Sequence, residues 1–180
     1  PEFLMGKIDE FGGPEAYNHY AVGWAWAMDT PYQWTKQVAS HWGGTRNGTI
    51  VHWPNGFAAR GEMRSQFCHV IDIAATVLDA AGLPAPTFVN GVQQMPLHGT
   101  SMTYSFDDAG AAERHDLQYF EMFVNRGIYH QGWTAVTRHS TPWVMVPLPA
   151  IDDDVWELYS PDDWTQAHNL AGDNPAKLAE

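Results

Sequence analysis

The sequence contains little cysteine, little positive charge and no long apolar run. Cys68 is the only cysteine among the 180 residues, which excludes an intrachain disulfide and a cysteine-based zinc site. This cysteine content fits a reducing compartment, and the sequence leaves both the cytoplasm and the periplasm open as locations. No segment reaches the roughly 18 consecutive apolar residues that a membrane-spanning helix needs. We therefore expect a soluble protein that has no membrane partner.

The scarcity of cations argues against two further classes of partner. Lys and Arg together number 9 against 21 Asp and Glu, which gives a formal net charge of −12. Nucleic acids and anionic lipid surfaces are bound by cations that neutralise phosphates, so we expect neither as a partner. A small anionic substrate stays possible, because one well-placed Lys or Arg can dominate the potential of a pocket.

The residues that are abundant indicate a folded chain. Hydrophobic residues make up 44% of the sequence and charged residues only 17%, which excludes intrinsic disorder. Nine Trp, seven Tyr and eight Phe supply large rings that build cores, interfaces and substrate clefts. The start, Pro1–Met5, has neither an initiator Met at position 1 nor the basic start of a signal peptide. These features predict a piece of a longer protein.

The first half of the chain predicts loops, one lone strand and one long helix. We expect loop up to about residue 34, a helical turn over Lys36–Ser40, and a short buried strand over Thr49–Trp53. A lone strand needs partners from elsewhere, which again indicates truncation. Residues Ser65–Ala81 predict a helix that ends at Gly82, with one apolar face formed by Phe67, Val70, Ile71, Ala74, Val77, Leu78 and Ala81. Within this face we expect Val70, Ile71, Ala74, Val77 and Leu78 to be buried.

The second half predicts a small antiparallel sheet. Three runs are joined by short turns, which we place at Asn125-Arg126 and Gln131-Gly132, and a fourth strand follows later in the chain. The four expected strands are Gln118–Val124, Gly127–His130, Trp133–Thr137 and Trp156–Tyr159. Helices are expected over Asp162–Ala171 and Pro175–Glu180. The fold class is therefore α/β, as an α+β fragment with a four-stranded antiparallel sheet packed with helices.

One stretch, Thr30–Gly48, carries the most chemically suggestive residues. It places Lys36, His41 and Arg46 around a Gly43-Gly44 pair, directly before the expected strand. Glycine lets a backbone approach a ligand closely, and loops at strand ends often hold the sites of α/β folds. An ordinary charged surface loop is the alternative. Nothing else stands out, since the chain has no nucleophile elbow, no phosphate-binding loop and no metal-spaced His or Cys cluster.

Lys36 followed by Gly43-Gly44-Thr45-Arg46 resembles the lysine segment of the type I sulfatases of the alkaline phosphatase superfamily. The version in this chain is close to that of bacterial arylsulfatases, although commoner members have Glu-Gly-Gly where this chain has His41-Trp42-Gly43-Gly44. Weaker similarities follow in the family's order along the rest of the chain. They lie in Phe67–Gly82, Leu97–Ser101, Trp133–Val136, Trp156–Tyr159 and Asn169–Ala171. Before the lysine segment, Gly13–Tyr20 also resembles the bacterial arylsulfatase branch.

The resemblance implies the C-terminal portion of a two-domain hydrolase of sulfate monoesters. Residues 1–100 would end the large domain, and residues 101–180 would form a small C-terminal subdomain that is truncated at its end. The family uses Ca²⁺ and a formylglycine made from Cys or Ser in a Cys/Ser-x-Pro-x-Arg motif. This chain has no such motif, because Cys68 lacks the Pro and the Arg, so the metal ligands and the nucleophile would come from the missing N-terminal portion.

Two site residues are predicted on this basis. Lys36 would be the catalytic contact to a sulfate or leaving-group oxygen, and His41 would contact the substrate; no metal ligand is expected in this chain. Two other functions stay open. One is a phosphonate or phosphate monoester hydrolase of the same superfamily. The other is a non-catalytic, aromatic-rich binding module, which exposed coplanar rings would favour.

Overall fold

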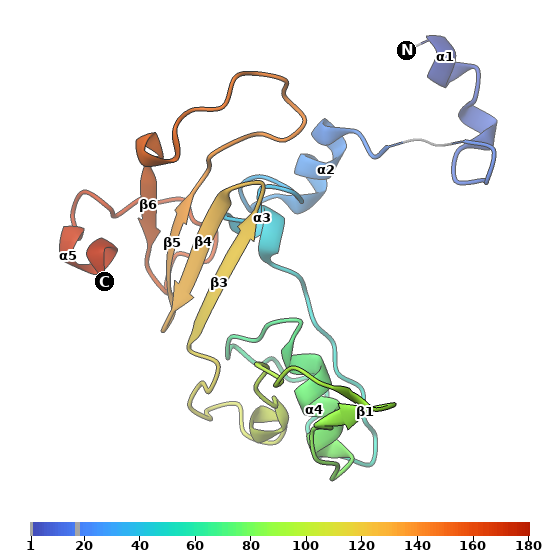
Figure 1. The fold of residues 1–180 in the computed structure, drawn as a ribbon, viewed down its shortest axis with the longest axis vertical. Helices are drawn as coiled ribbons and strands as arrows, with labels where there is room; N and C mark the ends of the chain where they lie inside the picture. The colour runs from blue at the N-terminus through green and yellow to red at the C-terminus, as the bar shows by residue number, and fades with distance from the viewer. Residues whose placement is uncertain (1, 17–18) are drawn as a thin grey trace.

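A computed structural model describes residues 2–16 and 19–180 and has a four-stranded antiparallel sheet at its centre (Figure 1). The strand order is β3-β4-β5-β6, with each strand paired to its neighbour in sequence. The mixed α/β class and the predicted sheet are thus confirmed. The strands are Leu117–Met122 (β3), Asn125–His130 (β4), Trp133–Thr137 (β5) and Trp156–Tyr159 (β6).

The turn between β3 and β4 differs from the prediction. Phe123 and Val124 form it, with φ of 54° and 64°, and the Val124 amide donates to Glu121 Oε1 over 2.7 Å. Two consecutive residues with positive φ match the right-handed twist of a tight hairpin. The turn predicted at Asn125-Arg126 is therefore wrong, because Asn125 begins β4 and is fully buried. The turn predicted at Gln131-Gly132 is confirmed.

Short helices precede the sheet. They are α1 (Glu2–Met5), η1 (Ile8–Glu10), α2 (Val22–Asp29) and α3 (Trp42–Thr45). The helical turn predicted over Lys36–Ser40 is wrong, because this stretch forms non-helical turns and the helix begins only at Trp42. The Gly43-Gly44 pair thus lies inside α3 instead of ending a helix.

A second group of elements lies beyond one end of the sheet, reached from α3 by an extended stretch (Figure 1). It holds α4 (Asp72–Ala80), the two-stranded pair β1 (Phe88–Val89) and β2 (Val92–Gln93), and η2 (Thr103–Ser105). The predicted turn at Asn90-Gly91 joins β1 to β2. The strand predicted over Thr49–Trp53 is wrong: no strand among the described residues pairs with it, and Ile50 is 95% exposed.

Helix α4 turns its polar side toward the rest of the chain. The Asp72 carboxylate accepts a hydrogen bond from the Thr100 amide at 2.7 Å, and Thr76 Oγ1 accepts one from the Met102 amide at 2.9 Å. Asp72 and Thr76 are buried. The predicted burial of the apolar face is therefore wrong, since most of that face is exposed, at Val70, Ile71, Ala74, Val77 and Ala81. The helix is also shorter than predicted, because residues 65–71 are not helical.

Aromatic and ionic contacts tie this group to the sheet. The Phe67 ring stacks on Tyr129 of β4 with 3.9 Å between centroids. Glu113 accepts hydrogen bonds from the Phe67 amide at 2.7 Å and from the Tyr129 hydroxyl at 2.6 Å. His115 Nδ1 lies 2.8 Å from the Asp72 carboxylate, just before β3. The division of the chain into a large-domain part, residues 1–100, and a small subdomain, residues 101–180, stays a prediction.

The C-terminal stretch is mostly turns. The helix predicted over Asp162–Ala171 is wrong, because the Asp163 carboxylate accepts hydrogen bonds from the Ala167 and His168 amides at 3.0 and 2.7 Å and folds the segment into turns. Two short helices are present, η3 (Ile151–Asp153) and α5 (Pro175–Ala179), and α5 confirms the last predicted helix. Within the part of the chain that the structure describes, no helix has the length and apolar character to cross a bilayer.

Candidate functional site

The segment around Lys36 lies against strand β4, and Gln166 of the C-terminal stretch connects it to β5. The Ser40 backbone packs closely on Gly127 of β4, where an added Cβ would come within 2.8 Å of the Ser40 oxygen. Gln166 joins α3 to β5: its Oε1 accepts a hydrogen bond from the Trp42 amide at 2.8 Å, and its Nε2 donates to Thr134 Oγ1 at 3.0 Å. The C-terminal half therefore fixes the position of this segment.

Gly43 and Gly44 let the chain fold back over α3. A Cβ on Gly43 would lie 2.1 Å from the Trp34 carbonyl oxygen, and a Cβ on Gly44 would lie 2.1 Å from the Val38 carbonyl oxygen. Real Cβ atoms do not approach so closely, so any side chain at either position would force the loop to move. The need for glycine at both positions thus has a steric cause.

Lys36 occupies the tip of a tight turn. The Val38 amide donates to the Thr35 carbonyl over 3.1 Å, and both of these residues are buried. Gln37 has a φ of 82°, which is rare for a residue other than glycine. Lys36 itself is exposed, and among residues 2–16 and 19–180 no carboxylate pairs with its ammonium. A fixed backbone therefore presents an exposed cation.

His41 belongs to the same segment but faces the sheet. Only 1% of its surface is exposed, its Nδ1 lies 2.9 Å from Ser40 Oγ, and its Nε2 lies 3.4 Å from Glu157 Oε2 in β6. The hydrogen bond from His41, together with one from the Tyr159 hydroxyl, holds the pKa of Glu157 below its ordinary value, against the opposing effect of burial. The role of His41 in substrate binding stays a prediction.

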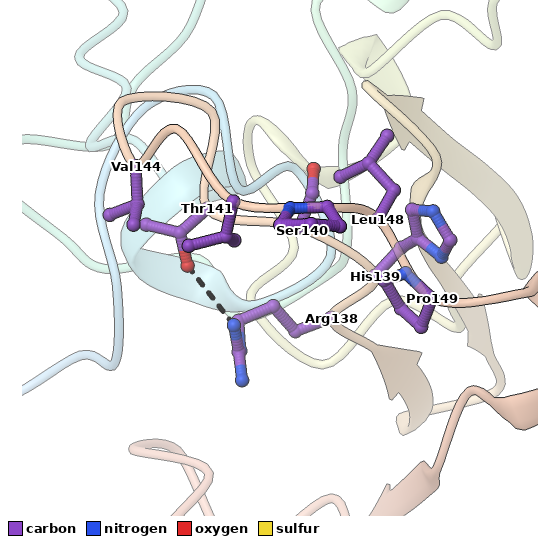
Figure 2. A pocket seen from close by; sticks show the side chains of 9 residues that line it. Arg138, His139, Ser140, Thr141, Val144, Leu148 and Pro149 are labelled. Carbon is purple, nitrogen blue, oxygen red and sulfur yellow. Dashed lines mark hydrogen bonds between the residues drawn. The ribbon is translucent and has the colours of Figure 1, made fainter.

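A second cation, Arg138, lies near the lysine segment. Its guanidinium sits over the Trp34 ring at 4.8 Å, and Trp26 of α2 stacks on Trp34 with 5.8 Å between centroids. Arg138 also donates to Thr141 Oγ1 over 3.0 Å at the edge of an open hollow (Figure 2). Sequence reasoning missed Arg138 because it lies in no motif. It also missed the contacts of Asn125 and Gln166, since long-range hydrogen bonds leave no local pattern.

Comparison with known protein families supports a family for this segment. Residues 12–83 match the family model of the sulfatases. The match covers less than half of the chain and includes Lys36, His41, α3 and α4, and it supports a hydrolase of the sulfatase family. The four-stranded sheet lies outside the matched residues.

The described residues do not fit the cofactors of a sulfatase. They include no group of three or more His, Cys, Asp or Glu side chains that could hold a metal ion. Cys68 is half-buried, and burial followed by the nearby Asp72 carboxylate raises the pKa of its thiol, which disfavours the reactive thiolate. No chemical step is therefore assigned to Cys68 or to a metal bound by these residues.

Proposed function

We propose that this chain is part of a sulfatase that hydrolyses sulfate monoesters, in which Lys36 contacts a sulfate oxygen or the leaving oxygen. The observation that carries the proposal is the placement of Lys36. It lies inside the matched segment, on a turn whose flanking residues are buried, and its ammonium is exposed and unpaired among the described residues. A surface lysine of no consequence does not need such a supported backbone.

The chemistry explains the choice of lysine. Hydrolysis of a sulfate ester moves negative charge between the sulfate oxygens and the leaving oxygen. A cation held in place before the reaction stabilises that developing charge without reorganising at the moment of bond breaking. A compact ammonium acts as a point charge and donates up to three hydrogen bonds, whereas a guanidinium is a wide planar fork.

The finer proposal is an arylsulfatase that uses formylglycine and Ca²⁺, both supplied by residues outside this chain. Its support is the resemblance of the Lys36 segment and of Gly13–Tyr20 to bacterial arylsulfatases. Aromatic rings also lie next to the lysine turn, where Trp26 is 49% exposed and stacks on Trp34. Rings of this kind offer apolar contact area to the organic group of an aryl ester.

The same proposal includes a macromolecular partner, the N-terminal portion of the sulfatase. The exposed apolar side chains of α4 and its approach support it. Val77 of α4 is 61% exposed, and Val70, just before this helix, is 70% exposed, while the polar side of α4 already packs on this chain. Apolar surface of this kind marks an interface.

An assay on the intact protein that contains this chain tests the proposal. Turnover of 4-nitrophenyl sulfate is expected, with little turnover of 4-nitrophenyl phosphate or of phenylphosphonate esters. Preferred turnover of the phosphorus esters would favour the phosphohydrolase alternative. The binding-module alternative has less support, because the segment that carries these rings lies within residues 12–83, which match the sulfatase family model.

A further inference from the structure

One buried side chain, Asn125, connects the lysine turn to the segment that carries Arg138. Asn125 begins β4 and has no exposed surface. Its Nδ2 donates to the Gln37 carbonyl oxygen over 3.2 Å, and its Oδ1 accepts hydrogen bonds from the His139 and Ser140 amides, each at 3.0 Å. One amide group therefore contacts both the residue after Lys36 and the two residues after Arg138.

The contact falls on the strained part of the turn. Gln37 holds a φ of 82°, and residues other than glycine keep such a conformation only where their surroundings enforce it. The bond from Asn125 fixes the Gln37 carbonyl, and the packing of Ser40 on Gly127 fixes the chain three residues later. The direction of the Lys36 side chain follows from this backbone.

Only an amide side chain satisfies all three partners at this position. The Gln37 carbonyl requires a donor, while the two backbone amides require an acceptor. Asp has the shape of Asn but offers only acceptors when ionised, so it would keep the bonds to residues 139 and 140 and face the Gln37 carbonyl without a proton. Asn125→Asp would therefore remove the donor to Gln37 and keep the acceptor for residues 139 and 140.

We propose that Asn125 is a positioning residue that holds Lys36 in its working orientation through the Gln37 carbonyl. The inference rests on the proposed function of Lys36. By this proposal a residue of β4, which lies outside the matched residues 12–83, directly influences the chemistry of Lys36 inside them.

The test compares Asn125→Asp with a matched control in the intact sulfatase that contains this chain. The control is Thr137→Val on the neighbouring strand, which removes one equally buried hydrogen bond, from Thr137 Oγ1 to the Val155 carbonyl, without touching the lysine segment. Each variant is measured for kcat with 4-nitrophenyl sulfate, alone and combined with Lys36→Ala. The hydrogen exchange of the Val38 amide, which closes the turn, gives a readout besides activity.

We expect Asn125→Asp to lower kcat by roughly 10- to 100-fold, as misplacement of a reacting group does, and to speed exchange at Val38. Thr137→Val is expected to change neither, and Asn125→Asp is expected to add no loss in the Lys36→Ala background. The proposal would be overturned if Asn125→Asp had the same kcat as the control Thr137→Val. It would also be overturned if Asn125→Asp lowered kcat by the same factor in the Lys36→Ala background as in the wild type. If Asn125→Asp does not fold, Asn125→Ser, which is too short to reach Gln37, is judged by the same criteria.

Failure of the proposed function has a different signature. If Lys36→Ala alone leaves turnover unchanged, the role of Lys36 is wrong. Exchange at Val38 then still decides whether Asn125 holds the turn, since faster exchange in Asn125→Asp supports that contact and unchanged exchange overturns it.

Discussion

The carbonyl oxygen of Val38 lies 2.1 Å from the point that a Cβ on Gly44 would occupy. This close approach lets the lysine turn lie on α3, and it makes Gly44→Ala a severe change. We expect it to lower the free energy of unfolding by about 3 kcal/mol or more, because extra atoms in a packed site force the backbone to shift. Urea unfolding followed by tryptophan fluorescence measures this loss.

The chain provides a matched control in Gly48. No atom lies within 4 Å of a Cβ built on Gly48, and its φ is not in the left-handed region. Gly48→Ala is therefore expected to change stability by less than about 0.5 kcal/mol. Equal losses for the two substitutions would show that the close packing on Gly44 is not the cause.

Gln166 should be sensitive to a substitution that keeps its size and removes its polarity. Gln166→Leu would leave the Trp42 amide and the Thr134 hydroxyl buried without this partner. An unsatisfied buried group costs about 1–3 kcal/mol, so a loss of about 2–4 kcal/mol is expected. Gln93→Leu, at an exposed position of β2, serves as the control, and a similar loss there would count against the bridging role of Gln166.

The lowered pKa of Glu157 predicts that part of the free energy of unfolding is lost in acid. Its pKa in the folded protein lies below the ordinary value of 4.5, chiefly because His41 hydrogen-bonds to it, and Tyr159 and Arg138 also favour its charged form. A lowered pKa stabilises the fold above the unfolded-state pKa, and this contribution disappears as the pH falls through the folded-state pKa.

Glu157→Gln should therefore be less stable than the wild type at neutral pH and nearly equal to it in acid. Unfolding free energies measured from about pH 7 to about pH 3 would reveal the converging curves. A difference that stays constant across this range would refute the assigned coupling between His41 and Glu157.

The antiparallel sheet could be predicted because its first three strands follow one another with short turns and all four strands are rich in β-branched and aromatic residues. Its first turn could not. Asn125 has the composition of a turn residue, and the actual turn uses Phe123 and Val124, which rarely accept positive φ. The buried contacts of Asn125 with Gln37 and residues 139–140 outweigh this local preference.

The helix and the lone strand of the first half show a different limit. Periodicity correctly identified the apolar stripe of α4. It could not show that the opposite, polar side faces this chain, because that side is held by hydrogen bonds from the backbone of residues 100 and 102 to Asp72 and Thr76. Thr49–Trp53 has a strand composition without a partner strand among the described residues. Lys36 was predicted from resemblance alone, and no local pattern could reveal the sheet contacts that support its turn.

The 180-residue chain by itself is expected to have no sulfatase activity, because the nucleophile motif is absent from its sequence. Purified chain incubated with 4-nitrophenyl sulfate should release product no faster than a heat-inactivated sample. Release above that control would contradict the assignment of the nucleophile to residues outside this chain.

The central claim concerns Lys36 and is tested most directly by kcat/KM of Lys36→Ala in the intact enzyme. Lys177→Ala in α5, where the ammonium pairs with Glu180, serves as the control. Loss of one preorganised donor to a charge-developing oxygen costs on the order of 3 kcal/mol, so a decrease of roughly 100-fold or more is expected while stability changes by less than about 0.5 kcal/mol. Lys36→Arg should not restore the full rate, since a planar fork does not replace a compact ammonium. A kcat/KM for Lys36→Ala equal to that of the wild type and of Lys177→Ala would contradict the account.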